Sequence, residues 1–280
     1  MEGLKASSNN GTGKKPTEKQ GKVFFASDFH LGADARLSSV ERERQVIRWL
    51  DMVSSEASAI YLVGDIFEFW FEYKKAVPKG FTRLLGKLAE LRDGGLSIEA
   101  FTGNHDLWMF GYFEQELGIP VHKKPIQVDI SGKSFFIGHG DGLGPGDTGY
   151  KLMKKVFVHP FSQWLYRWLH PDVGIRLANF FSQTSRAATP PEERHWLGEE
   201  KEWLFQYCNR KISQGVAPDY FIFGHRHLPV DWQLANGTSR YLNLGDWMWH
   251  NSYAVFDGQD MEIRFFEHEA RLISNRAILK

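Results

Sequence analysis

Five short apolar segments of this 280-residue chain each stop abruptly at glycine, aspartate, asparagine or histidine. Each segment has the length and composition of a buried β-strand. The segments with the residues that follow them are Lys22–Ser27 before Asp28-Phe29-His30, Ala59–Val63 before Gly64-Asp65, Ser97–Thr102 before Gly103-Asn104-His105-Asp106, Ser134–Ile137 before Gly138-His139-Gly140-Asp141, and Asp219–Phe223 before Gly224-His225-Arg226-His227.

Helical patterns separate the first three of these segments. Ser38 and Glu41 form a capping box that begins the first helix. The apolar residues at helical spacing are Val46, Ile47, Leu50 and Val53, and then, before the third strand, Phe81, Leu84, Leu85, Leu88 and Leu91. This alternation predicts an α/β fold, in which ligands bind beyond the carboxyl ends of the strands. After the strand-like segment Tyr241–Leu244, two more such segments are expected to form a second sheet that closes a sandwich, namely Tyr253–Phe256 and Met261–Phe266.

Seven of the residues at the strand ends are donors that metal ions use in proteins. Taken singly, each has a simpler explanation, because a Gly-Asp pair is usually a turn and a buried histidine is usually hydrogen-bonded within a core. Burying all of them together without a cation would be very costly. Imidazole together with carboxylate suits Mn, Fe or Zn. The set of donors contains no cysteine, which argues against a structural zinc site. The set is Asp28, His30, Asp65, Asn104, His139, His225 and His227.

Charge and cysteine content narrow the classes of function. Lys+Arg and Asp+Glu are equal at 34 each, so the neutral net charge disfavours a nucleic-acid partner and a nuclease. The single cysteine, Cys208, suits a reducing compartment. Residues 1–21 are polar and contain no apolar signal segment, so we expect a disordered tail and a cytoplasmic protein. Residues 269–280 are expected to form a C-terminal tail.

The ordered motifs Asp-x-His, Gly-Asp, Gly-Asn-His-Asp, Gly-His-Gly-Asp and Gly-His-x-His resemble those of the calcineurin-like metallophosphoesterases over nearly the whole chain after the tail. The resemblance implies a four-layer α/β/β/α sandwich and two divalent metal ions that share Asp65. The implied ligands are Asp28, His30, Asp65 and His227 for one metal, and Asp65, Asn104, His139 and His225 for the other. Two cations about 3.5–4 Å apart can polarise a phosphoryl group and lower the pKa of a shared water.

His105 follows Asn104 directly, so the two are too close to bind one metal comfortably. We therefore expect His105 to stabilise the transition state or to protonate the leaving oxygen, beside Asn104 and Asp65 in the catalytic set. Glu68 either orients the ring of His105 or is a surface turn residue, and the sequence leaves both open.

Two segments, Gly64–Trp70 and His139–Tyr150, look like those of the UDP-2,3-diacylglucosamine pyrophosphohydrolases of lipid A biosynthesis. This resemblance implies cleavage of UDP-2,3-diacylglucosamine to lipid X and UMP, typically with manganese. The chain departs from the proteobacterial members at His105, where they carry arginine, whereas the general metallophosphoesterase pattern has histidine there.

Residues 151–203 are expected to be a helical insertion between two parts of the core, 22–150 and 204–268. The insertion mixes aromatic residues with Lys and Arg, which is typical of a helix at a membrane interface or of the wall of an acyl-chain pocket. An ordinary helical cap that packs on the sandwich is the alternative. In the resembled family this insertion is the lid that holds the acyl chains. Candidate substrate contacts are Asp147, Trp164, Trp168 and Arg186.

The sequence thus predicts a manganese-dependent hydrolase of a UDP-linked diacyl sugar, bound peripherally at the cytoplasmic face of the inner membrane. One alternative is a phosphodiesterase of another lipid or of a soluble nucleotide diester. A scaffold of the same fold without activity is disfavoured because all seven donors are present, and metal storage or sensing does not explain His105 beside Asn104.

Overall fold

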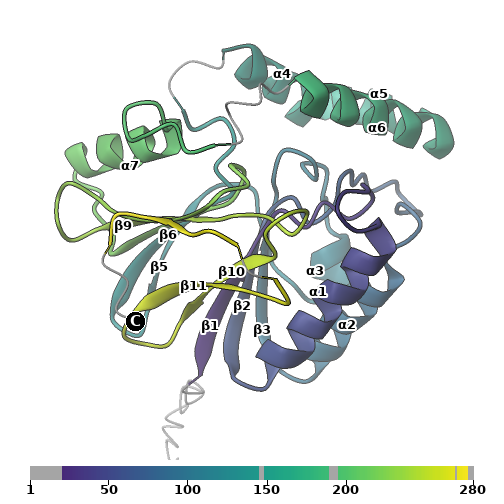
Figure 1. Cartoon of the computed structure of the whole chain (residues 1–280). Helices are drawn as coiled ribbons and strands as arrows, with labels where there is room; N and C mark the ends of the chain where they lie inside the picture. Colours follow the sequence, from purple (N-terminus) through teal and green to yellow (C-terminus); the bar gives the residue numbers. More distant parts are fainter. Residues whose placement is uncertain (1–20, 145–147, 189–194, 269, 277–280) are drawn as a thin grey trace, which may run out of the picture.

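The computed structural model describes residues 21–144, 148–188, 195–268 and 270–276, and it contains two six-stranded sheets packed face to face (Figure 1). The first sheet has the order β11-β10-β1-β2-β3-β4 and the second has the order β12-β8-β9-β7-β6-β5. The strands of the first sheet are β1 (Lys22–Ala26), β2 (Ala57–Val63), β3 (Ser97–Phe101), β4 (Val121–His122), β10 (Ser252–Phe256) and β11 (Met261–Phe265). Those of the second are β5 (Ile126–Ile130), β6 (Lys133–Ile137), β7 (Tyr220–Phe223), β8 (Pro229–Gln233), β9 (Arg240–Leu244) and β12 (Ile273–Ser274).

Helices cover the outer faces of both sheets (Figure 1). Helices α1 (Ser39–Ser54), α2 (Thr82–Asp93) and α3 (Tyr112–Glu116) lie against the first sheet, and α7 (Trp203–Ser213) lies against the second. The arrangement is the four-layer α/β/β/α sandwich that the sequence predicted. Three further helices lie together beyond one end of the sandwich, namely α4 (Thr148–Val158), α5 (Pro160–Arg167) and α6 (Pro171–Ala188).

Successive residues of a strand point to opposite faces of the sheet, and this alternation builds the layers. In β1, Phe24 and Ala26 pack toward α1 and α2, whereas Val23 and Phe25 point into the core between the two sheets. Strands buried on both faces read as continuous apolar segments, which is why the sequence identified them readily.

The capping box at the start of α1 forms as predicted, because the Ser38 side chain accepts a hydrogen bond from the backbone N–H of Glu41 and the Glu41 carboxylate accepts one from that of Ser38. Two prolines divide the helical part of the insertion into separate helices. Pro160 and Pro171 are the first residues of α5 and α6, where a missing backbone N–H has no cost.

The prediction that Tyr253–Phe256 and Met261–Phe266 belong to the second sheet is wrong. They form the hairpin β10–β11, and β10 pairs antiparallel with β1, with Val23 opposite Phe256. The strand that precedes them, β9, is the one that belongs to the second sheet, where it lies parallel to β7. The pattern of buried residues shows that β10 is covered on both faces, but it carries no information about which strand lies beside it.

The structure describes the two segments predicted as tails to different extents. The N-terminal one lies outside the described residues, apart from Gly21. Within the C-terminal one, β12 pairs parallel with β8, and Nη1 of Arg276 lies 3.2 Å from Oδ2 of Asp231. No described helix is long and apolar enough to cross a membrane.

Candidate metal centre

All seven predicted donors lie at one edge of the sandwich, in the loops that follow five strands. The parallel neighbours β1, β2 and β3 deliver Asp28, His30, Asp65 and Asn104 from the first sheet, and the parallel neighbours β6 and β7 deliver His139, His225 and His227 from the second. The side chains form two groups whose donor atoms lie within 4.8 Å of one another, Asp28 with His30 and His227, and Asp65 with His139 and His225.

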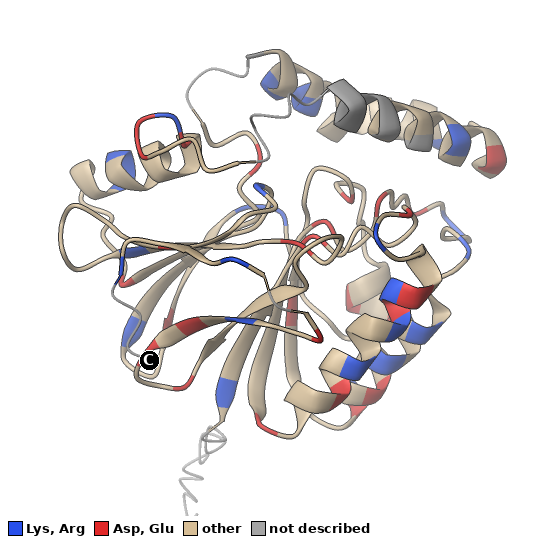
Figure 2. Cartoon of the chain, in the orientation of Figure 1, with Lys and Arg blue, Asp and Glu red and all other residues tan. Residues whose placement is uncertain are grey.

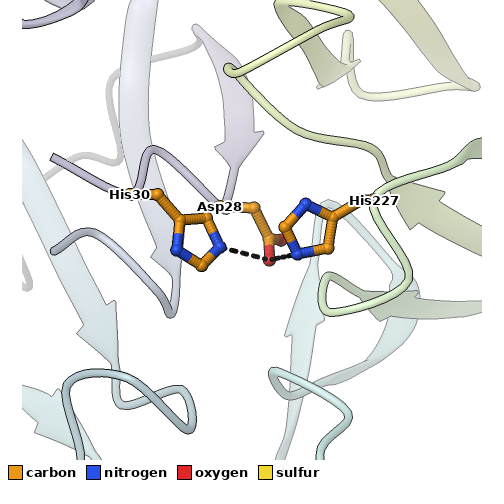
Figure 3. A group of neighbouring side chains, drawn as sticks. All are labelled: Asp28, His30 and His227. Atoms are coloured by element: carbon orange, nitrogen blue, oxygen red, sulfur yellow. Dashed lines mark ion pairs between the residues drawn. The ribbon is translucent and has the colours of Figure 1, made fainter. Parts of the chain in front are cut away.

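In the first group, the carboxylate of Asp28 lies between two imidazole rings (Figure 3). Its Oδ1 atom is 3.7 Å from Nε2 of His30 and 3.4 Å from Nε2 of His227. The two rings stack with their centroids 4.9 Å apart. Three donor atoms from two sheets therefore converge on one position.

The second group is centred on Asp65 and Asn104. Oδ2 of Asp65 lies 3.2 Å from Nε2 of His139, and Oδ1 of Asn104 lies 3.3 Å from the same nitrogen and 2.8 Å from Nδ1 of His225. Oδ2 of Asp65 is also 3.7 Å from Nε2 of His30. Because this one oxygen faces both groups, Asp65 stands between them, where a bridging ligand would be placed.

Divalent cations fit this set of residues. Oδ1 of Asp28, Nε2 of His30 and Oδ2 of Asp65 are buried and have no hydrogen-bond partner, which would be costly for a site that binds nothing. Burial lowers the pKa of His30, but the neighbouring carboxylates of Asp28 and Glu68 outweigh burial and raise that pKa to about 10. The carboxylates thus favour positive charge at the very position where the donor atoms converge.

The backbone carries strain at this edge of the sheets. Five of the donors have left-handed backbone dihedrals, and their φ angles are 57° for Asp28, 45° for His30, 50° for Asp65, 68° for His225 and 55° for His227. Such conformations cost on the order of 1 kcal/mol or more in residues with a side chain, and they cluster at functional sites. These backbone dihedrals end each strand and turn the five side chains toward one common point.

Two glycines permit close approach of the loops. A Cβ atom on Gly224 would lie 2.5 Å from Oδ2 of Asp28, and one on Gly103 would overlap the carboxylate of Asp65. Any side chain at these two positions would therefore displace a donor. The need for close approach explains why glycine precedes the donors in these loops.

Each of three histidines is oriented by a hydrogen bond from its second ring nitrogen. Nδ1 of His30 lies 3.0 Å from Oε2 of Glu68, and Nδ1 of His139 lies 2.8 Å from the carbonyl oxygen of Val63. Nδ1 of His227 lies 3.1 Å from Oδ2 of Asp246. These contacts leave Nε2 of each ring directed to the centre, in the arrangement that orients metal-binding histidines.

Backbone N–H groups fix the carboxylates in the same way. The N–H of His105 donates to Oδ1 of Asp65 at 2.9 Å, and that of His225 donates to Oδ2 of Asp28 at 3.0 Å. The other oxygen of each carboxylate is the unpartnered one that faces the centre. The guanidinium of the buried Arg42 donates to carbonyl oxygens of the loop after β1, including those of Phe29 and His30, both at 2.7 Å.

Sequence reasoning missed two of these supporting residues, Asp246 and Arg42. A signal for Asp246 was present, because the strand β9 is followed by Gly245-Asp246 just as β2 is followed by Gly64-Asp65. Arg42 lies on the apolar face of α1, and a buried arginine needs hydrogen-bond acceptors within the protein. Its position on that face was therefore the available signal.

Glu68 is 3% exposed, which contradicts the alternative of a surface turn residue. Its carboxylate accepts from His30, while Nδ1 of His105 lies 3.0 Å from its backbone carbonyl oxygen and 3.8 Å from its Oε1. Glu68 thus contacts both rings, and its backbone carbonyl oxygen lies closer to His105 than its Oε1 atom does. The ring of His105 meets that of His30 edge-on, with centroids 4.7 Å apart.

The predicted substrate contacts have varied placements. Trp164 lies on α5 and Trp168 directly follows that helix; the two are 51% and 74% exposed and contact each other with ring centroids 6.0 Å apart. Among the described contacts of these two rings, none reaches the donors. Asp147 lies outside the described residues, and Arg186 belongs to α6 but its side chain is not among those described.

The three helices beyond the strand ends contact the loops of the centre. Nε1 of Trp108 donates to the carbonyl oxygen of Phe157 at 2.8 Å, and the ring of Tyr166 packs on Trp108 with centroids 4.6 Å apart. Many apolar side chains of the helices and of the link between α5 and α6 are exposed, namely Leu152, Met153, Val156, Phe157, Val158, Phe161, Trp164, Leu165, Trp168, Leu169, Val173, Leu177, Phe180 and Phe181.

Comparisons with known proteins agree with this geometry. A family model described as calcineurin-like phosphoesterase matches residues 21–229. A protein of Porphyromonas gingivalis named UDP-2,3-diacylglucosamine hydrolase is 40% identical over 88% of this chain and 98% of its own length. A protein of the same name from Shewanella piezotolerans is 24% identical over 86% of this chain and 97% of its own.

Among solved structures, Yfce, a phosphoesterase from E. coli, is 17% identical with a TM-score of 0.43, and the match covers 88% of this chain and 93% of that one. The family model spans most of the chain, and the P. gingivalis relative is matched over nearly its whole length. This chain therefore belongs to the calcineurin-like phosphoesterases, in the family of the UDP-2,3-diacylglucosamine hydrolases.

Proposed function

We propose that this chain hydrolyses the diphosphate of UDP-2,3-diacylglucosamine and releases 2,3-diacylglucosamine 1-phosphate and UMP in lipid A biosynthesis. The observation that carries the proposal is the 40% identity to the P. gingivalis hydrolase over 98% of that protein, together with two convergent donor groups in one site. A soluble nucleotide diester or another lipid remains the alternative substrate.

The roles of the residues follow from their positions. We assign one cation to Asp28, His30, Asp65 and His227, and a second to Asp65, Asn104, His139 and His225, with Asp65 shared. When bound, the two cations would polarise the phosphoryl oxygens and activate a water for in-line attack. His105 lies at the edge of the first group with a partly exposed ring, so it can contact a phosphoryl or leaving oxygen without binding metal.

Manganese is the cation that we propose. The donors are carboxylate oxygens, an amide oxygen and imidazole nitrogens, a mixture that suits Mn²⁺ and gives no sulfur ligand for a softer metal. Purified protein loaded in turn with Mn²⁺, Zn²⁺ and Mg²⁺ should be most active with Mn²⁺. Higher turnover with either of the other two would overturn this choice.

Helices α4–α6 are proposed to bind the acyl chains and the surface of the inner membrane at its cytoplasmic face. Between residues 148 and 188 the chain has one acidic residue, Asp172, beside the basic residues Lys151, Lys154, Lys155, Arg167, Arg176 and Arg186. Figure 2 shows this sparseness of acidic side chains, in contrast to the mixed charges along α1 and α2. Basic residues beside exposed aromatic ones suit an interface of anionic lipid.

The test of the substrate compares UDP-2,3-diacylglucosamine with a soluble aryl phosphodiester, using purified protein in Mn²⁺. We expect UMP and the acylated sugar phosphate to appear far faster than the aryl product, and both reactions to be lost in Asp65→Ala. Cleavage of the aryl diester alone would retain the metal centre and reject the lipid substrate.

The test of the membrane contact is sedimentation with vesicles of anionic phospholipid. Replacing Trp164 and Trp168 together by alanine should release the protein from the vesicles and leave hydrolysis of the aryl diester unchanged. The matched control is Trp249→Ala, because Trp249 is 53% exposed on the loop after β9 and lies outside the three helices. Equal binding of all three proteins would reject the contact.

A further inference from the structure

Ser182 of helix α6 reaches into the metal centre from outside the two sheets. Its Oγ atom makes a short hydrogen bond to Oε1 of Glu68 and lies 3.1 Å from Nδ1 of His105. Side chains of α4 reach the other side of the centre, where Tyr150 and Lys154 both donate to the carboxylate of Asp141, two residues after His139. The contacts of Ser182 join residues that are 114 and 77 positions apart in the sequence.

The direction of each hydrogen bond follows from the chemistry of the partners. The backbone carbonyl of Glu68 can only accept, so its 3.0 Å contact makes Nδ1 of His105 the donor. The carboxylate of Glu68 also accepts, so the hydroxyl of Ser182 donates to it. That hydroxyl must then accept from Nδ1–H of His105, which is shared between Ser182 and the carbonyl.

This network holds a proton on Nδ1 of His105 and directs Nε2 toward the substrate, where Nε2 donates to a phosphoryl or leaving oxygen when it also carries a proton. It also connects His105 with His30, because the other oxygen of Glu68, Oε2, accepts from Nδ1 of His30 at 3.0 Å. One carboxylate therefore orients a proposed metal ligand directly and a proposed catalytic ring through Ser182.

We propose that Ser182 is a positioning residue, through which the placement of helix α6 sets the orientation and tautomer of His105. This inference rests on the proposed function of His105, and it gives the helices beyond the strand ends a second role. Besides contacting lipid, they complete the hydrogen bonding of the centre. The site is then fully ordered for turnover when α6 is placed so that the Ser182 hydroxyl is hydrogen-bonded to Glu68 and His105.

The test uses Ser182→Ala, which removes the hydroxyl, and Ser182→Thr, which keeps it. Nitrogen-15 NMR of the histidines in Zn²⁺-loaded protein reports the tautomer, and a His105→Gln variant assigns the signal. We expect a protonated Nδ1 in wild type and in Ser182→Thr, and values averaged between tautomers in Ser182→Ala. This readout needs no substrate, so it stays informative even if UDP-2,3-diacylglucosamine is not the substrate.

Kinetics on the soluble aryl diester provide the second readout. Loss of one orienting hydrogen bond should lower kcat of Ser182→Ala about five- to tenfold with KM and bound metal unchanged, whereas Ser182→Thr should stay within about twofold of wild type. Ser162→Ala, which removes a hydroxyl from α5, is the matched control and should behave as wild type. An unchanged NMR signal in Ser182→Ala, or loss of metal together with kcat in both Ser182 variants, would overturn the proposal.

Discussion

Oδ2 of Asp246 lies 3.1 Å from Nδ1 of His227, and this buried carboxylate fixes the ring whose Nε2 faces Asp28. Asp246 is itself held by the backbone N–H groups of Trp249 and His250, at 2.9 and 3.0 Å. Burial raises its pKa, but hydrogen bonds from His227 and His250 outweigh burial and hold that pKa well below the usual range. Asp246 therefore stays ionised and acts as a fixed acceptor for His227.

Replacing Asp246 by asparagine should weaken metal binding while the fold remains. Loss of such a supporting carboxylate typically lowers metal affinity 10- to 100-fold, so we expect about that change in the Mn²⁺ dissociation constant. Isothermal titration with Mn²⁺ measures it. Asp129→Asn, at an exposed position of β5, is the control. Equal affinity in Asp246→Asn and wild type would contradict the support that we assign to this residue.

Replacing Gly103 by alanine should inactivate the enzyme, because the new Cβ atom would overlap the carboxylate of Asp65. We expect loss of bound metal and of hydrolysis of the aryl diester. Gly86 offers a matched control in α2, where a Cβ would meet nothing within 4 Å. Gly86→Ala should be as active as wild type and more stable by about 0.5–1 kcal/mol, since alanine favours the helix. Metal analysis and thermal unfolding of both variants test the pair.

Arg226 separates the two histidines of the last motif and forms a buried ion pair with Glu202. Its Nε and Nη2 atoms donate to Oε2 and Oε1 of Glu202 at 3.0 and 2.8 Å. Removing one partner leaves the other charge buried, so Arg226→Met should lower the free energy of unfolding by about 3–5 kcal/mol. Urea unfolding measures the loss.

The control for that experiment is Glu262→Gln, because the pair that Glu262 makes with Arg264 is largely exposed. Its midpoint in urea should stay near that of wild type. A midpoint for Arg226→Met as high as that of the control would show that the buried pair does not hold the loop of His225 and His227.

Removal of metal should lower the stability of the protein. A ligand present at about 100 times its dissociation constant stabilises the folded state by about 2.7 kcal/mol. EDTA should therefore lower the Tm of wild type by several degrees and leave the Tm of Asp65→Ala nearly unchanged. An equal shift in both proteins would locate the effect of EDTA outside this site.

Much of the fold and of the site could be predicted from the sequence because one physical pattern carries both. A strand buried on two faces is a continuous apolar segment, and a donor such as Asp65 directly after it must lie at the edge of the sheet. The α/β layering and the convergence of seven donors follow from five repetitions of that pattern, whereas the four-layer sandwich was implied by the resemblance to the calcineurin-like metallophosphoesterases.

Other features could not be predicted because they depend on contacts between distant residues. The pairing of β10 with β1 is one, since any strand covered on both faces has the same composition whatever its neighbour. Ser182 is another. A serine on a helix is commonly solvated, and only the placement of α6 brings its hydroxyl to Glu68 and His105.

The central claim is that Asp65 joins two donor groups into one dinuclear catalytic centre. Metal analysis and EPR of Mn²⁺-loaded protein test it most directly, with Asp65→Ala beside wild type. We predict two Mn²⁺ per chain and a spin-coupled spectrum in wild type, and in Asp65→Ala the loss of coupling with a fall of at least about 1000-fold in hydrolysis of UDP-2,3-diacylglucosamine. A coupled pair of ions, or undiminished turnover, in Asp65→Ala would contradict the account.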